Sequence, residues 1–335
     1  MKKKNHFDYI ICGGGASGLL LAFRICNDPF FTNKSILLIE KEHKNSNDRT
    51  WCFWESNEGD LQEIIHKTWN QSFFASKDFC LNFNLNPYQY KMIRSLDFYQ
   101  FMQKRLKTFS QLTQVTDEVK KIESNRVTTL EKEYNSDLIF SSILDPTKLF
   151  QQKKYPVLQQ HFLGQIIETK NNCFDPDRIE FMNFDVPQKG NTRFMYVLPL
   201  SSNKALLEYT LFSEDLLDRQ DYVDEITAFA NQIPTGGYKV IEEERGNIPM
   251  TCFRFDISNT ENILQIGTAG GWTKPSTGYT FQRINSKTKA LVEFLKLNLP
   301  LKKFGQKSRL RVEKEFEENL ISEKLLEFVH SIFKN

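Results

Sequence analysis

Near the start of the chain, a glycine-rich turn has the residue types and spacing that bind a pyrophosphate. Residues 13–18 read Gly-Gly-Gly-Ala-Ser-Gly, a G-x-G-x-x-G pattern between an apolar strand predicted over 7–12 and an apolar helix predicted over 19–26. Glycines in this pattern permit a tight turn, close approach of the backbone to the pyrophosphate, and close packing of helix on strand. The free N–H groups at the helix N-terminus attract the phosphate charge. We expect the contacts here to come from Gly13, Gly15, Ala16, Ser17 and Gly18.

A carboxylate follows at the distance expected for a ribose ligand. A second buried strand is predicted over 35–39 and ends on Glu40, 22 residues after Gly18. An acidic residue about 20 residues beyond such a turn takes the ribose hydroxyls of a bound dinucleotide. The strand, turn, helix and acid together predict a dinucleotide site, against the alternative of a glycine loop without a ligand.

A second glycine segment near the end of the chain favours FAD over NAD as that dinucleotide. A buried strand predicted over 263–267 is followed by glycines up to residue 271, and residues 275–279 open a new helix. A late strand–glycine–helix step that returns to the first nucleotide site is typical of FAD folds, and the helix N-terminus can stabilise negative charge on the flavin. The sequence has no second G-x-G-x-x-G in mid-chain, which argues against a dedicated NAD(P)H domain.

One glutamate has the setting of a proton donor. Glu208 lies in a predicted strand in which Leu206, Thr210 and Phe212 share its face by period-two alternation. A buried carboxyl resists ionisation, because desolvation raises its pKa, and it can then deliver a proton to a weak base. The alternative, a solvent-facing glutamate on an edge strand, stays open at this point.

The remaining elements suggest how these residues are positioned. A helix is predicted over 95–106, a strand over 138–140, an antiparallel sheet over about 150–253, and a C-terminal helix over about 312–332. We therefore predict an α/β fold in which a Rossmann-like FAD-binding domain is interleaved with an antiparallel β-sheet substrate domain. The expected FAD-binding domain comprises 1–60, 93–150 and 254–300; the substrate domain comprises 61–92 and 151–253; and 301–335 form a helical segment.

Composition excludes several classes of function. The 335 residues carry a net charge of +2, too small to predict binding to nucleic acid. The six cysteines form no CxxC pair and no metal-ligand spacing with histidine, so we expect reduced thiols, no metal site and a cytoplasmic location. We expect neither a signal peptide nor a transmembrane helix, although the chain could lie on a membrane surface. Composition leaves the oligomeric state open.

Five ordered segments between about residues 7 and 285 resemble the FAD-dependent lycopene cyclase family of carotenoid biosynthesis. They are residues 47–55 (Asn-Asp-Arg-Thr-Trp-Cys-Phe-Trp-Glu), 160–169, 194–213, 246–251 (Gly-Asn-Ile-Pro-Met-Thr) and 267–279. The resemblance implies an FAD-binding fold like that of p-hydroxybenzoate hydroxylase and glutathione reductase. It implies a redox-neutral isomerisation, the closure of the linear ends of lycopene to β-rings, with FAD in its reduced form and NADPH as the usual electron source. It also implies peripheral association with a membrane.

The resemblance adds roles for individual residues. Glu208 matches the family's essential acid, and Arg49 and Val119 are expected at the adenosine end of FAD. The remaining cofactor contacts are expected from Gly267, Ala269, Gly270, Thr277 and Gly278. The aromatic walls expected around a cationic intermediate are Trp51, Trp54, Tyr196, Phe212 and Trp272.

This sequence departs from the family pattern at several positions. The acid and the arginine expected after Met182 are replaced by Asn183 and Asp185, a charged pattern is missing at Ser141, and the second acid after Glu208 is Tyr209. Two other hypotheses stay open: a monooxygenase or prenyl reductase of the same fold, and, because of Asn183 and Ser141, a flavin binder without catalysis.

Overall fold

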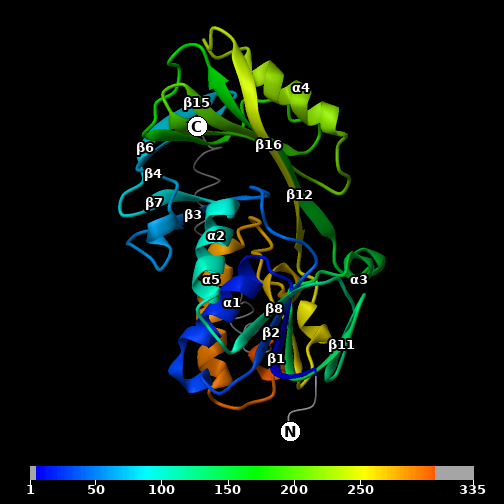
Figure 1. Ribbon diagram of the computed structural model, residues 1–335. Helices are drawn as coiled ribbons and strands as arrows, with labels where there is room; N and C mark the ends of the chain where they lie inside the picture. The colour runs from blue at the N-terminus through cyan, green and yellow to red at the C-terminus, as the bar shows by residue number, and fades with distance from the viewer. Residues whose placement is uncertain (1–4, 306–335) are drawn as a thin grey trace.

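The computed structural model describes residues 5–305, which form three β-sheets and the helices packed against them. Figure 1 shows a parallel sheet with α1, α2 and α5 in the lower half and a long antiparallel sheet with α4 in the upper half. The small third sheet lies between them.

The first sheet carries the glycine-rich turn. Its strands lie in the order β8-β2-β1-β11-β10-β9, with β17 paired to β11. They are β1 (His6–Cys12), β2 (Ile36–Glu40), β8 (Leu112–Thr116), β9 (Val119–Glu123), β10 (Arg126–Thr129), β11 (Glu133–Ser141) and β17 (Ile263–Gln265). Because β1, β2, β11 and β17 run parallel, their carboxyl ends meet at one edge. Ligands of open parallel sheets bind at this edge.

Both faces of the parallel sheet are covered, which explains its continuous apolar runs. Tyr9 and Ile11 of β1 pack against α1 (Ala16–Asn27), α2 (Ser95–Leu106) and α5 (Phe281–Leu295). Ile10 and Cys12 point to the opposite face, where the β9–β10 hairpin contributes Val127 to the core. The period-two alternation of β1 therefore divides its side chains between two cores.

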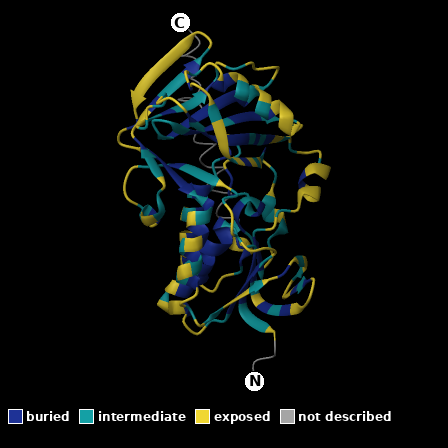
Figure 2. Ribbon diagram, turned by 45° about the horizontal axis from the view of Figure 1, so that its top comes forward, coloured by how far each residue is buried: buried dark blue, intermediate teal, exposed yellow. Residues whose placement is uncertain are grey.

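The second sheet is antiparallel except at one pair. Its order is β16-β12-β15-β14-β13-β5-β6, and only β13 and β5 run parallel. The strands are β5 (Gln71–Ser76), β6 (Phe79–Asn84), β12 (Val157–Thr169), β13 (Arg178–Asn183), β14 (Thr192–Ser201), β15 (Lys204–Ser213) and β16 (Tyr238–Thr251). In Figure 2 the burial colours separate dark strands in the sheet interior from exposed strand β6 at its edge.

Helix α4 (Arg219–Ala230) covers one face of this sheet, and the third sheet lies against the other. Leu207 and Leu211 of β15 pack beneath α4, whereas Leu206 belongs to the core shared with Trp69 and Tyr90. The third sheet consists of β3 (Thr50–Glu55), β7 (Gln89–Arg94) and β4 (Lys67–Trp69) in the order β3-β7-β4. The short helices are α3 (Pro146–Gln151), η1 (Pro29–Phe31), η2 (Gln62–Ile64), η3 (Phe255–Ser258) and η4 (Gly267–Gly270).

Most elements expected from hydrophobic periodicity are confirmed. The helix predicted over 95–106 is α2, the strand over 138–140 lies within β11, and the strand over 263–267 is β17, which ends two residues early. The all-strand interpretation of 150–253 is wrong at its start, where α3 ends at Gln151, and at α4. The helix predicted over 312–332 lies outside the described residues. From the sheets we propose that the chain divides into the expected FAD-binding and substrate domains.

A buried lysine ties the third sheet to the neighbouring loop. The Lys91 side chain is 1% exposed, and its Nζ donates to Glu55 Oε2 at 2.9 Å, to Gln62 Oε1 at 3.0 Å and to the Asn57 carbonyl at 3.1 Å. Glu55 is thus part of a structural ion pair.

Replacing this lysine should destabilise the fold. Lys91→Met leaves Glu55 without its charge partner, so the free energy of unfolding should fall by about 3–5 kcal/mol, measured by urea denaturation. Lys289→Met is the control, because Lys289 and its partner Asp60 are each 50% exposed. Such exposed pairs contribute about 0–1 kcal/mol. Equal losses in the free energy of unfolding would show that the buried Lys91–Glu55 pair contributes no more than the exposed Lys289–Asp60 pair.

No helix within residues 5–305 has both the length and the apolar character needed to cross a bilayer.

Candidate active site

The glycine-rich turn has the tight geometry that its sequence predicts. Gly13 has a positive φ of 102°, and its N–H donates to the Ile39 carbonyl at 2.8 Å. A Cβ at Gly18 would lie 1.9 Å from the Gly13 carbonyl oxygen, so no side chain fits there. Gly15 differs: it has an ordinary φ of −78° at the start of α1, and a Cβ there would meet nothing within 4 Å. The protein itself therefore does not require a glycine at position 15.

Glu40 is held at the end of β2 by main-chain donors. Its Oε2 accepts from the Gly14 N–H at 2.5 Å and its Oε1 accepts from the Lys41 N–H at 2.9 Å. The charge of Glu40 also raises the pKa of Tyr99, after the larger effects of burial and Asp48, while Arg49 lowers it. Glu40 and Arg49 therefore share a neighbourhood around the Tyr99 hydroxyl.

The late glycine segment returns to the same turn. Gly267 has a φ of 60°, and a Cβ there would lie 2.6 Å from Ser17 Oγ at the start of α1. Ala269 is buried next to it in η4. Val119 and Ala269 line one cavity of about 720 Å³ beside β9 and β17. The structure thus brings Gly267 to Ser17 at the glycine-rich turn. Ala269 lies two residues further on and lines the cavity, as does Val119.

Gly278 approaches the antiparallel sheet just before α5. Its φ is 70°, and a Cβ there would lie 1.7 Å from Gln160 Oε1 on β12. That oxygen and Thr277 Oγ1 are both buried and have no hydrogen-bond partner. Two unpaired polar atoms beside a glycine mark a place where a polar ligand would be accommodated.

Glu208 occupies a central strand. β15 lies between β12 and β14, so the edge-strand alternative is wrong. Glu208 shares its face with Leu206 and Phe212, as the alternation predicts, and its Oε1 accepts from Thr210 Oγ1 at 3.0 Å. Burial, followed by the charge of Glu244, raises the pKa of Glu208 to about 8. Such a carboxyl stays protonated at neutral pH and can act as an acid.

A second carboxyl lies on the same face of the sheet. Glu244 of β16 is 9% exposed, and its Oε2 accepts from Thr50 Oγ1 of β3 at 2.7 Å. Burial raises its pKa to about 7. Local sequence does not distinguish Glu244 as a candidate, because a run of three glutamates at 242–244 is typical of a solvated strand face.

Aromatic side chains gather on the side of the sheet to which Glu208 points. Tyr196 is its direct cross-strand partner on β14, and Trp54 of β3 lies against Tyr90 in a tilted arrangement with ring centroids 4.7 Å apart. The Tyr279 hydroxyl is buried and has no well-formed hydrogen bond, although Tyr90, Trp54 and Tyr196 lie close enough to influence its pKa, which burial raises. Tyr90 and Tyr279 were missed by the sequence analysis, although Tyr279 closes one of the family-like segments.

The expected aromatic wall is only partly brought together. Phe212 lies near Phe194, with ring centroids 5.7 Å apart, on the Glu208 face. Trp51 points the other way from β3 and stacks on Phe281 at 5.0 Å, and Trp272 is 3% exposed in the same helical core. Alternation along β3 explains the difference, since Thr50, Cys52 and Trp54 share one face while Trp51 and Phe53 share the other.

The departures from the family pattern lie outside this constellation. Tyr209 points beneath α4, where its hydroxyl accepts from Arg193 at 3.2 Å. Asn183 donates to Glu180 Oε2 at 3.0 Å, and its Oδ1 accepts from the Asp185 N–H at 2.9 Å. Ser141 is buried at the end of β11, where its Oγ accepts from Ile143 N–H.

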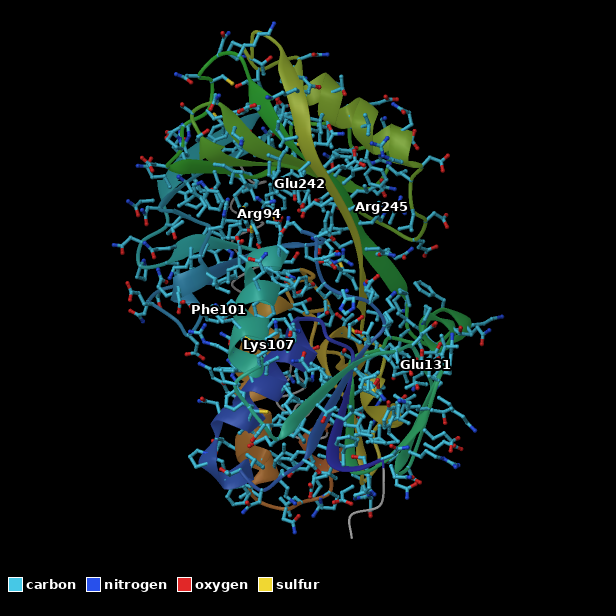
Figure 3. The ribbon with its side chains drawn as sticks, viewed as in Figure 1. Arg94, Phe101, Lys107, Glu131, Glu242 and Arg245 are labelled. Atoms are coloured by element: carbon cyan, nitrogen blue, oxygen red, sulfur yellow. The ribbon has the colours of Figure 1, made fainter. Side chains whose placement is uncertain are left out.

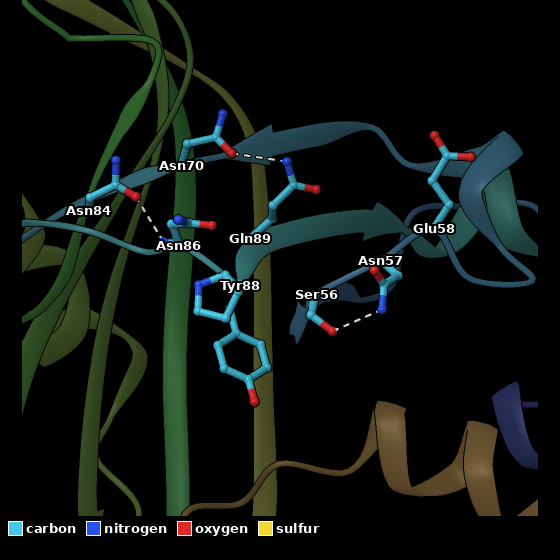
Figure 4. A pocket seen from close by; sticks show the side chains of 9 residues that line it. Ser56, Asn57, Glu58, Asn70, Asn84, Asn86, Tyr88 and Gln89 are labelled. Carbon is cyan, nitrogen blue, oxygen red and sulfur yellow. Dashed lines mark hydrogen bonds between the residues drawn. The ribbon is translucent and has the colours of Figure 1, made fainter.

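A separate polar cavity offers no comparable chemistry. It measures about 430 Å³ and lies beside β4 and β7, lined mainly by amide side chains (Figure 4). Gln89 donates to Asn70 at 2.9 Å, and the Asn84 side chain accepts from the Asn86 N–H at 2.8 Å. The Gln89 and Asn84 amides are thus held by neighbours in the cavity wall.

Comparison with known proteins agrees with the resemblance described above. Residues 8–323 match the family model described as lycopene cyclase protein. The chain is 24% identical over 308 residues to a lycopene beta cyclase of Arabidopsis thaliana, covering 84% of this chain and 58% of that protein. It is 24% identical over 303 residues to one of Narcissus pseudonarcissus, covering 82% and 57%. The chain thus spans somewhat more than half the length of these relatives.

Solved structures of low sequence identity share the fold. A geranylgeranyl bacteriochlorophyll reductase-like protein of Thermoplasma acidophilum is 12% identical, with a TM-score of 0.67 over 93% of this chain and 84% of that one. PqsL of Pseudomonas aeruginosa, a probable FAD-dependent monooxygenase, is 13% identical, with a TM-score of 0.63 over 93% of both chains. The predicted α/β fold class, with a Rossmann-like FAD-binding domain and an interleaved antiparallel sheet, is confirmed.

Proposed function

This chain belongs to the lycopene cyclase protein family, and from that premise we propose that it closes the linear ends of lycopene, or of a related carotenoid, to β-rings. The observation that carries the proposal is the position of Glu208: a carboxyl with a pKa raised to about 8, on a central strand, facing aromatic rings. Alkenes are very weak bases, so the acid that protonates one must be neutral and shielded from water.

The proposed reaction starts with a proton transfer from Glu208 to the terminal alkene of the substrate. The resulting tertiary cation is attacked by the neighbouring double bond, which forms the ring bond. Loss of a proton from the adjacent ring carbon then regenerates an alkene, so no electrons are gained or lost. Tyr196, Trp54 and Tyr279 would turn their ring faces towards the cation, each contributing up to about 2 kcal/mol when desolvated.

The residues of the glycine-rich turn suit FAD. Gly15 leaves space that the protein does not fill, and Glu40 has a fixed carboxylate for ribose hydroxyls. The unpaired atoms of Gln160 and Thr277 are available for polar groups of a flavin ring. Reduced FAD would supply negative charge beside the cation. We propose NADPH as the electron source, contact with a membrane surface that holds the substrate, and a cytoplasmic location.

Product analysis tests this function. The full chain with reduced flavin is incubated anaerobically with lycopene in liposomes, and products are separated by chromatography. We expect cyclic carotenoid, no consumption of NADPH per ring, and one deuterium in each new ring in heavy water. Hydroxylated product would instead support a monooxygenase of the same fold, and hydrogenated product a prenyl reductase.

A further inference from the structure

Two glutamates on neighbouring strands flank a single glycine. Gly164 of β12 pairs with Glu208 of β15 on one side and with Glu244 of β16 on the other. A Cβ at position 164 would lie 3.5 Å from the Glu208 Cβ and 3.4 Å from the Glu244 Cγ. The two side chains therefore flank a position that has no side chain of its own.

Glu244 is anchored on one oxygen and unpaired on the other. Thr50 Oγ1 donates to its Oε2 at 2.7 Å, while its Oε1 is buried without a hydrogen-bond partner within the described part of the chain. Leaving a buried polar atom unpaired costs stability. A glutamate in this setting is better explained by a role towards its neighbour than by a contribution to folding.

We propose that Glu244 is a positioning residue for the proton donor: it ionises first, and its carboxylate across Gly164 keeps the transferable proton on Glu208. This inference rests on the proposed function of Glu208. Burial and then the charge of Glu244 raise the pKa of Glu208. This direction is expected for two carboxyls that lie on either side of one glycine, because a charged carboxylate disfavours ionisation of its neighbour.

Other charged groups around the pair act on Glu244 more than on Glu208. Glu242 on the same strand raises the pKa of Glu244, while Arg49 and Arg94 lower it. Figure 3 shows Arg94 and Glu242 close together beneath β16, where they form an ion pair. Besides Glu244, Cys52 of β3 and Tyr196 of β14 lie close enough to Glu208 to feel its charge, and burial is the largest cause of the raised pKa of each. Both are therefore neutral when Glu244 is charged.

Infrared spectroscopy of the full chain with bound flavin tests the proposal. The carbonyl band that Glu208→Gln removes reports the protonated Glu208 carboxyl, with or without turnover. We expect Glu244→Gln to lower the pH midpoint of this band by about 1–2 units, because a negative neighbour is lost. Under turnover, the loss of cyclisation at alkaline pH should move to lower pH by the same amount. Glu244→Asp should restore most of the shift, since it keeps the charge.

Glu243→Gln is the matched control, because Glu243 points to the opposite face and pairs with Arg219 at the surface. It should leave the midpoint unchanged. An unchanged midpoint in Glu244→Gln, or equal shifts in both variants, would overturn the proposal. If the wild-type chain yields no cyclic product, the proposed function fails, yet the infrared midpoint still decides whether the two glutamates share one proton.

Discussion

Glu208→Gln should reduce ring closure by about a thousand-fold or more, because general acid catalysis contributes roughly 10²–10⁴-fold and Glu208 is the acid paired across the strands with Tyr196. The amide keeps the size of the side chain and can still accept from Thr210, so the pocket should keep its shape. Flavin content should remain that of the wild type, since Glu208 lies on the antiparallel sheet and not at the glycine-rich turn. Product formation is measured by chromatography and flavin by absorbance.

Glu168→Gln serves as a control for this experiment, because Glu168 lies at the end of β12 in an ion pair with exposed Lys239. Its rate should match that of the wild type. Normal cyclisation by Glu208→Gln would exclude Glu208 as the acid, and Glu244, whose pKa burial raises to about 7, would then be the next candidate on that sheet face.

Glu208→Gln should also change the free energy of unfolding in a pH-dependent way, and the same unfolding experiment shows whether the variant folds. The folded pKa of Glu208 is about 8, above the value near 4.3 of an unfolded glutamate. Its favourable contribution is therefore fully present below pH 4 and is lost as pH rises through 8. At pH 9, the free energy of unfolding of Glu208→Gln should exceed that of the wild type by about 1–3 kcal/mol, measured by urea denaturation. Below pH 4 this advantage should disappear; an advantage independent of pH would contradict the shifted pKa.

Gly15→Ala should weaken FAD binding by at least about ten-fold, or roughly 1.4 kcal/mol, without destabilising the flavin-free protein. The added methyl group meets no protein atom within 4 Å, so its only obstacle would be a ligand that approaches the backbone closely. Gly18→Ala is the matched comparison. Its Cβ would lie 1.9 Å from a backbone oxygen, so both stability and FAD binding should fall.

Titration with FAD and thermal unfolding of the flavin-free protein separate these outcomes. For Gly18→Ala we expect a loss of about 1–3 kcal/mol in the free energy of unfolding. Wild-type FAD affinity in Gly15→Ala would mean that no pyrophosphate lies against this turn.

Local sequence patterns were sufficient for the parallel sheet. Apolar runs ending at Cys12 and Glu40 predict buried parallel strands, and a glycine pattern fixes the turn between strand and helix. The alternation around Glu208 correctly predicts which face of β15 it shares. Helix α4 was missed although Tyr222, Ile226 and Phe229 follow helical spacing, because the surrounding strands favoured one interpretation for the whole stretch.

Long-range pairing explains what the sequence could not predict about the site. Glu244 and Glu208 are 36 positions apart in the chain, and only the register of β12 with both neighbours brings them to the same glycine. Trp51 and Trp54 were assigned together, yet their orientations are opposite because an odd number of positions separates them. Neither the register between distant strands nor the packing of β3 against α5 is encoded in a local pattern.

Gly164 has a consequence for the evolutionary history of the family. A side chain here would press on Leu206 at 2.9 Å and come between two acids, so the space left by those neighbours, and not a positive φ, constrains the position. Substitutions at 164, 208 and 244 should therefore be inherited together. A relative with a larger residue at the position of Gly164 should also have replaced the counterpart of Glu244 or Leu206, and such covariation can be counted in any sufficiently diverse set of relatives.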